Sequence, residues 1–104
     1  MKILHVLLSR GFAGSERSTA ESCNAQCQRH EVHLVLRRDH RRAGASVVDH
    51  LDPRVQVHEV PARLFTGWAL GRCVGRIGPD VIHAHLRRST RLVARLRTEA
   101  AKVS

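Results

Sequence analysis

Two short segments carry the residue types that could do chemistry. The first is the turn Gly11–Gly14, which follows an apolar run and precedes a helical pattern. Backbone N–H groups at such a turn can approach a phosphate, and a following helix adds a favourable dipole. The second is His83 and His85, two residues apart at the end of another apolar run. On a strand both imidazoles point to one side, where a neutral ring can hydrogen-bond a hydroxyl or transfer a proton.

Each segment also has a purely structural explanation. A tight turn between a strand and a helix often contains glycine, whatever it binds. This turn lacks the three glycines of the dinucleotide fingerprint and the Gly-Lys-Ser/Thr of a P-loop, which argues against both protein classes. The only residues that would support an NADP-linked protein are Arg37 and Arg38, after the second strand. Of the two histidines we assign His83 to packing and His85 to the site.

No metal site is expected from the sequence. Two histidines at this spacing could share an ion, but no third ligand stands out. The other six histidines, His5 among them, are scattered along the chain and are interpreted as mostly structural or solvated.

Alternating strand and helix patterns predict an α/β fold in one domain, residues 1–104. Strands are expected at 2–9, 31–36, 55–60 and 80–85, and helices at 15–28, 45–51, 67–77 and 87–102, the first of them capped by Ser15. This alternation favours a Rossmann-like, doubly wound parallel sheet with strand order 3-2-1-4. The first and fourth strands are then neighbours, and Gly14 and His85 should meet at their carboxyl ends.

The charge is strongly basic and unevenly distributed. The formal net charge is +9, and residues 62–104 hold nine basic residues against two acidic ones. On the last predicted helix Arg88, Arg91 and Arg95 follow steps of three and four residues. They are interpreted either as a solvated face or as a surface for an anionic acceptor or lipid headgroups.

A non-enzymatic basic module that binds nucleic acid or an anionic membrane through residues 62–104 is therefore the alternative function. With no Tyr, two Phe and one Trp, the chain lacks the aromatic residues that stack on bases, which argues against nucleic acid.

The cysteines and the N-terminal residues bear on the compartment. Three cysteines cannot form a closed disulfide framework, which fits a reducing compartment. The apolar run Ile3–Leu8 is short and interrupted by His5, so we expect no targeting segment. The expected location is the cytoplasm, with the inner face of the membrane as an alternative.

Four collinear segments carry a resemblance to a known family. They are the opening Met1–Val6, the turn Ser9–Arg17, the segment His30–Val35 and the motif Pro79–His85. Together they resemble the N-terminal domain of a GT-B fold glycosyltransferase, of the family-4 retaining group that includes lipopolysaccharide and mannosyl transferases.

The resemblance implies an acceptor-side domain that faces a donor-binding domain. The activity of such enzymes is transfer of a sugar from a nucleotide-sugar donor to a sugar or lipid acceptor, without a further cofactor. The match implies that Gly14 and the backbone of Ala13 lie near the donor diphosphate, and that His85 reaches the transferred sugar. Ala13 stands where the family commonly has the first of two adjacent glycines, and its methyl group could crowd a phosphate.

The donor-binding half of such an enzyme has no counterpart in this sequence. We therefore expect a partial GT-B N-terminal domain, from a truncated or split enzyme, that is inactive as a single chain. A separate donor-binding domain would be its partner. The edge of the fourth strand is expected to be uncovered.

Overall fold

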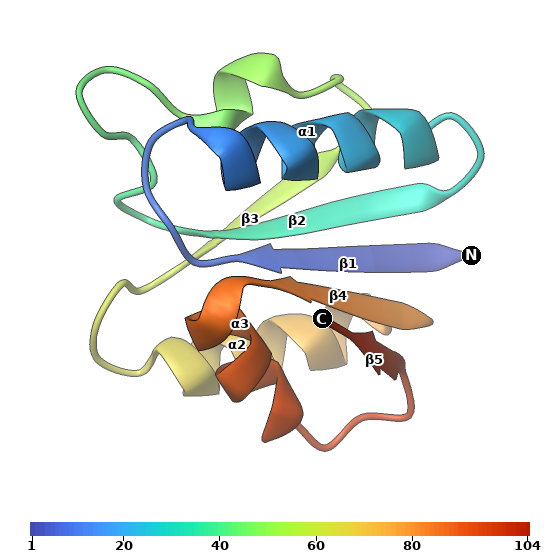
Figure 1. The fold of residues 1–104 in the computed structure, drawn as a ribbon. Helices are drawn as coiled ribbons and strands as arrows, with labels where there is room; N and C mark the ends of the chain where they lie inside the picture. The colour runs from blue at the N-terminus through green and yellow to red at the C-terminus, as the bar shows by residue number, and fades with distance from the viewer.

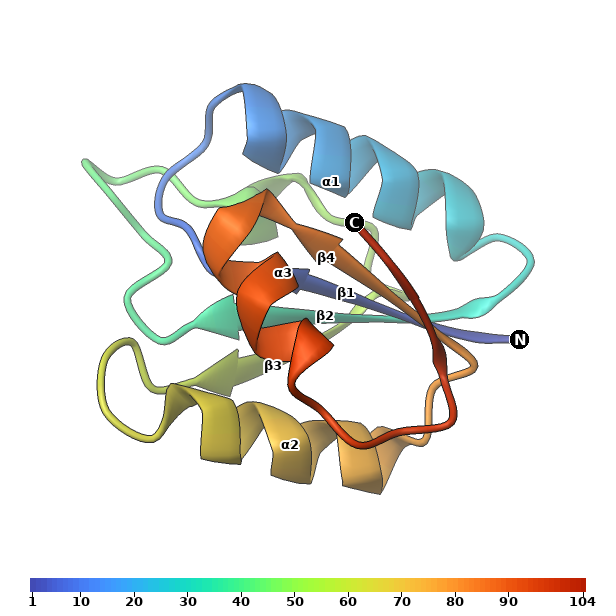
Figure 2. The same cartoon turned by 60° about the horizontal axis from the view of Figure 1, so that its bottom comes forward.

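The computed structural model describes all residues, 1–104, and shows one parallel sheet with helices on both faces (Figures 1 and 2). In chain order the elements are β1 (Lys2–Leu7), α1 (Gly14–Gln26), β2 (Glu31–Arg37), the 3₁₀ helix η1 (Val47–His50), β3 (Gln56–Val60), α2 (Thr66–Ile77), β4 (Val81–His85), α3 (Leu86–Ala94) and β5 (Ala101–Val103).

The sheet has the order β3-β2-β1-β4-β5, and every neighbouring pair is parallel. The prediction of an α/β, doubly wound, Rossmann-like fold is confirmed. The predicted order 3-2-1-4 is the observed order of the first four strands, and β5 is added beside β4. Leu7 at the end of β1 pairs with Leu36 of β2 and with His85 of β4. These three strands therefore end at the same edge of the sheet.

Two apolar cores lie on the two faces of the sheet. On one face α1 and η1 cover β1 and β2, and Ala20, Cys23 and Cys27 form the inward stripe that their spacing predicts. On the other face α2 and α3 pack over β1, β2, β3 and β4 through residues such as Leu70 and Val93. The central strand β1 is buried along nearly its whole length, as its continuous apolar run indicates.

The C-terminal segment differs from its prediction. The last helix ends at Ala94, not near residue 102, and residues 101–103 form β5. The Ala101 N–H donates to the carbonyl oxygen of Asp80 at 3.0 Å, and Val81 pairs with Ala101 in the ladder. The open edge of β4 offers these hydrogen bonds, and they replace those that a longer helix would make. The expectation that this edge is uncovered is therefore wrong.

One smaller prediction is also corrected. Helix α1 begins at Gly14 with Ala13 as its N-cap, not Ser15. The side chain of Glu16 explains this start, because its carboxylate accepts the Ala13 N–H at 2.9 Å. In α2, Trp68 is 64% exposed and does not join the apolar core.

Candidate functional site

A surface hollow of about 370 Å³ lies where β1 and β4 end. Its lining comes from the start of α1, the junction of β4 with α3 and the C-terminal residue: Gly14, Ser15, Ser18, His83, Ala84, His85, Leu86 and Ser104. The structure therefore brings Gly14 and His85 together at one edge, as expected of loops that follow neighbouring parallel strands.

His85 stands at an abrupt junction between two elements. It is the last residue of β4 and also the N-cap of α3. The next residue, Leu86, has a φ of 70°, in the left-handed region. A non-glycine residue in this conformation costs about 1–3 kcal/mol and requires support from its surroundings.

A chain of hydrogen bonds fixes the orientation of His85. The Gln26 amide oxygen lies 2.7 Å from His5 Nε2, so this nitrogen carries the proton and His5 Nδ1 is an acceptor. His5 Nδ1 in turn lies 2.9 Å from His85 Nε2, which therefore donates. This arrangement leaves Nδ1 as the unprotonated nitrogen of His85. Gln26 at the far end of α1 thus sets which nitrogen of His85 is an acceptor.

The imidazole of His85 is neutral at pH 7. Burial is the main cause that lowers its pKa to about 4, and the neighbouring rings of His83 and His5 contribute to the same shift. The pKa of His5 is also lowered, chiefly by burial. A neutral His85 can accept a hydrogen bond from a hydroxyl group but does not supply a positive charge.

Sequence reasoning missed His5 and Gln26. His5 was grouped with the scattered histidines, yet it pairs with His83 across the β1–β4 ladder and is fully buried. The register of the two predicted strands could have found it, because alternation places His5, His83 and His85 on the same face. His83 is half-buried and its ring stacks on that of His85 at a centroid distance of 4.2 Å. Nothing in the sequence identifies Gln26.

The glycine turn presents different donors from those expected. The Ala13 N–H already donates to the buried carboxylate of Glu16, which also accepts the Ser9 hydroxyl at 2.9 Å. The backbone of Ala13 is therefore not a free donor. The N–H groups of Gly14 and Ser15, in the first turn of α1, have no partner within the protein. They are the donors at the hollow.

The model of Glycosyltransferase Family 4 matches residues 12–103. The chain therefore belongs to glycosyltransferase family 4. The matched residues include all of α1, β4 and β5, so both sides of the hollow lie within this glycosyltransferase-like module. No curated protein matches the chain.

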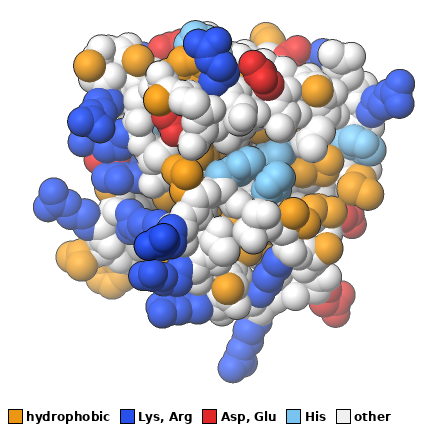
Figure 3. Space-filling view, viewed as in Figure 1, with side chains coloured by type: hydrophobic (Ala, Val, Ile, Leu, Met, Phe, Trp, Pro, Cys, Tyr) orange, Lys and Arg blue, Asp and Glu red, His pale blue; other side chains and the backbone are white.

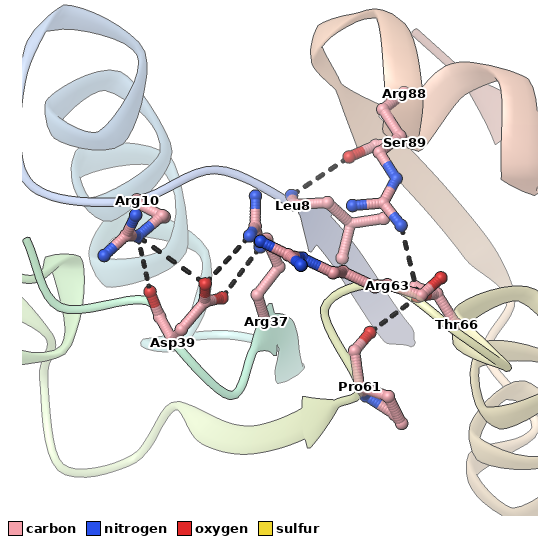
Figure 4. A network of polar contacts seen from close by, with 9 residues as sticks. All are labelled: Leu8, Arg10, Arg37, Asp39, Pro61, Arg63, Thr66, Arg88 and Ser89. Carbon is pink, nitrogen blue, oxygen red and sulfur yellow. Dashed lines mark hydrogen bonds and ion pairs between the residues drawn. The ribbon is translucent and has the colours of Figure 1, made fainter.

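The predicted arginine stripe of this family-4 chain is not continuous. Arg88 is half-buried, and its guanidinium donates to the Thr66 hydroxyl at 3.1 Å, while that hydroxyl donates to the Pro61 carbonyl at 2.6 Å (Figure 4). Arg88 thus joins α3 to the start of α2. Arg91 is exposed on α3, and Arg95 is exposed just beyond its end. Neither forms an ion pair, so only these two remain free for an anionic group.

A second polar network lies across the same edge of the sheet (Figure 4). Asp39 accepts two hydrogen bonds from Arg37, both at 2.8 Å, and lies 3.6 Å from Arg10. The hydrogen bonds from Arg37 are the main reason why the pKa of Asp39 is lowered. This network holds the loop after β1 against the loop after β2, and the Gly11 N–H adds a bond to the His40 carbonyl at 2.8 Å.

None of the helices has the length and apolar character that a membrane span requires.

Proposed function

We propose that this chain is the acceptor-side domain of an enzyme that transfers a sugar from a nucleotide-sugar to an acceptor. The observation that carries the proposal is that free helix N-terminal amides and a neutral, oriented imidazole line one hollow. The family match supports it, because the same residues fall within the matched region.

The two sides of the hollow suit the two parts of such a donor. The N–H groups of Gly14 and Ser15, at the positive end of the α1 dipole, suit the diphosphate. The unprotonated Nδ1 of His85 suits a hydroxyl of the transferred sugar. In this proposal His85 orients the sugar and does not act as an acid, because its low pKa keeps it neutral.

The proposal includes a second domain that holds most of the donor. The lining of the hollow contains no acidic side chain that would bind a ribose and no Phe, Tyr or Trp ring that would stack on a base. We therefore expect sugar transfer to require a donor-binding domain, on the same polypeptide or on a separate one. The purified 104-residue chain should be catalytically silent with UDP- and GDP-sugars. Sugar transfer by this chain alone would contradict the requirement.

The binding step can be tested without catalysis. NMR titration of the ¹⁵N-labelled chain with UDP-glucose and GDP-mannose should shift the amides of Gly14 and Ser15 and the ring resonances of His85. Gly14→Ala should abolish the shifts, because a methyl group would then face the phosphate. Gly75→Ala is the matched control, since an added Cβ meets no atom within 4 Å at either glycine. Unchanged shifts in Gly14→Ala, or shifts confined to other surfaces, would contradict the proposal.

We also propose that the start of α2 contacts an anionic membrane surface. Leu64, Phe65 and Trp68 are 74%, 74% and 64% exposed. The guanidinium of Arg72 lies 5.1 Å from the Trp68 ring centroid, and Arg63 is also exposed. Exposed aromatic residues beside cations are typical of a surface that inserts at the level of lipid headgroups.

Trp68 is the only tryptophan, so its fluorescence reports on this surface alone. We expect its emission to shift to shorter wavelength with vesicles that contain phosphatidylglycerol, and less so with phosphatidylcholine. Phe65→Ser should weaken the response, whereas Phe12→Ser on the distant α1 side should not. A shift with single-stranded DNA and none with vesicles would favour the nucleic-acid alternative instead.

A further inference from the structure

Three imidazoles converge on the face of the sheet that carries α1. His5 projects from β1, and His83 and His85 project from β4. One ring nitrogen of each lies within 4.8 Å of the other two. Figure 3 shows a group of histidine side chains at the surface of this face, below α1. The third ligand that the sequence did not reveal is thus present in the fold.

The strand geometry explains why the three rings meet. His83 and His85 alternate with Ala84 along β4, so they leave the same face of the sheet. His5 is the ladder partner of His83 on the neighbouring strand, and its ring lies 5.3 Å from that of His83 and 5.1 Å from that of His85. Backbone hydrogen bonds of the ladder hold the three Cα atoms, so side-chain rotations alone can bring the nitrogens onto one ion.

We propose that His5, His83 and His85 form a three-histidine site for a divalent transition-metal ion of the zinc type. Three imidazoles with a fourth position left to water or a ligand are an established zinc donor set. The donors are all imidazole nitrogens, which suits zinc, cobalt, nickel or copper better than magnesium or calcium. The fourth position would face the hollow beside Gly14.

The hydrogen bonds around the cluster prepare it for an ion. Gln26 fixes the proton of His5 on Nε2, so Nδ1 presents its lone pair toward the ring of His85. An outer partner that fixes the tautomer in this way is usual for a histidine that binds metal. The ring of His83 makes no hydrogen bond within the protein, so its nitrogens are available. An ion between His5 Nδ1 and His85 Nε2 would replace their 2.9 Å contact and place the His85 proton on Nδ1. The metal-bound chain would then present an N–H donor on that side of the ring, in place of the acceptor of the metal-free chain.

A second histidine pair provides an internal comparison. On the opposite face His33 Nδ1 lies 2.9 Å from His58 Nε2, the same distance as in the first cluster. The other nitrogen of His33 is bonded to Glu31 at 2.6 Å, and no third ring is present. This pair does not meet the requirement for three converging donors, so it serves as the control.

The overall charge provides a further criterion. The formal net charge of +9 repels a cation at long range, so affinity must come from the coordinate bonds. Added salt screens this repulsion and should leave zinc affinity unchanged or higher. The affinity of this basic chain for an anion or a nucleotide would instead fall as salt is added.

The test uses the full 104-residue chain without a histidine tag, after treatment with a chelator. Zn²⁺ titrated in competition with a chromophoric chelator should bind at one equivalent. Co²⁺ should give the intense visible bands of a four-coordinate ion. Gln26→Ala should weaken Zn²⁺ binding by about 10–100-fold, the usual effect of losing an outer partner. His83→Gln and His85→Gln should weaken it further.

The control variants are His58→Gln and Gln28→Ala, and both should bind Zn²⁺ like the parent chain. NMR of the ring nitrogens gives a measurement that needs no variant. One equivalent of Zn²⁺ should shift the resonances of His5, His83 and His85 before those of the other histidines. The proposal is overturned if no one-equivalent binding occurs, if these three histidines do not shift first, or if the controls lose as much affinity as the cluster variants.

Discussion

Ser89→Ala provides a direct test of how the two sides of the hollow are held together. The Leu8 N–H, at the exit of β1, donates to the Ser89 hydroxyl oxygen at 3.1 Å (Figure 4). Leu8 is 5% exposed and Ser89 is fully buried, so water does not reach this bond. The bond joins the loop that leads to Gly14 with the helix that follows His85.

The size of the effect follows from burial. Ser89→Ala removes the acceptor and leaves the Leu8 N–H buried without a partner, which costs about 1–3 kcal/mol. The free energy of unfolding of a domain of this size is about 5–15 kcal/mol, so the loss is easily measured. Thr90→Ala is the matched control. The Thr90 hydroxyl bonds only to the Leu86 carbonyl of its own helix at 2.9 Å, and its loss should cost less than about 0.5 kcal/mol.

The assay is urea unfolding followed by far-ultraviolet circular dichroism, with hydrogen exchange of the Leu8 amide as a local probe. Ser89→Ala should lower the urea midpoint and increase the exchange rate of the Leu8 amide more than the rates of the amides within β1. If Ser89→Ala and Thr90→Ala were equally stable, with Leu8 exchange unchanged, the bond would not hold the two segments.

Two further predictions concern the backbone and the histidine pair behind the sheet. Gly11 has a φ of +82°, and an added Cβ would lie 3.3 Å from Cβ of Arg42. Gly11→Ala should therefore lower the free energy of unfolding by about 1 kcal/mol or more, measured by urea unfolding. An unchanged urea midpoint would contradict this prediction. Burial is the main reason why the pKa of His58 lies below 6.5, and the charges of His33 and Arg76 contribute. The unfolded chain therefore binds more protons below pH 6.5, and stability should fall as the pH falls through this value. His58→Gln, measured with a chelator present, should make this fall smaller, and an unaltered pH profile would show that His58 does not contribute.

The strand order and the meeting of Gly14 with His85 were predictable from sequence because they follow from general rules. A near-continuous apolar run marked β1, and the alternation of strands with helices favoured parallel crossovers. Gly78 and Pro79, a pair that stops a helix, come directly before the strand expected at 80–85. Each of these signals is local in the sequence, so it can be recognised without knowing which distant residues pack against it.

The features that sequence reasoning missed depend on contacts between distant residues. The helical pattern of Leu92 and Leu96 suggested a long last helix, but hydrogen bonds to the open edge of β4 determine where the chain becomes extended. Ser15 had the right residue type for an N-cap, yet the buried carboxylate of Glu16 moves the start of the helix. The link from Gln26 to His85 spans two elements and has no local signature.

The junction at His85 has a mechanical consequence. No linker residue separates β4 from α3, and Leu86 is already in a restricted backbone conformation. Any rigid-body displacement of α3 must therefore rotate or translate the imidazole of His85 as well. If another domain pressed on the exposed face of α3 as it closed over the hollow, it would reposition this ring directly, without a flexible loop to absorb the motion.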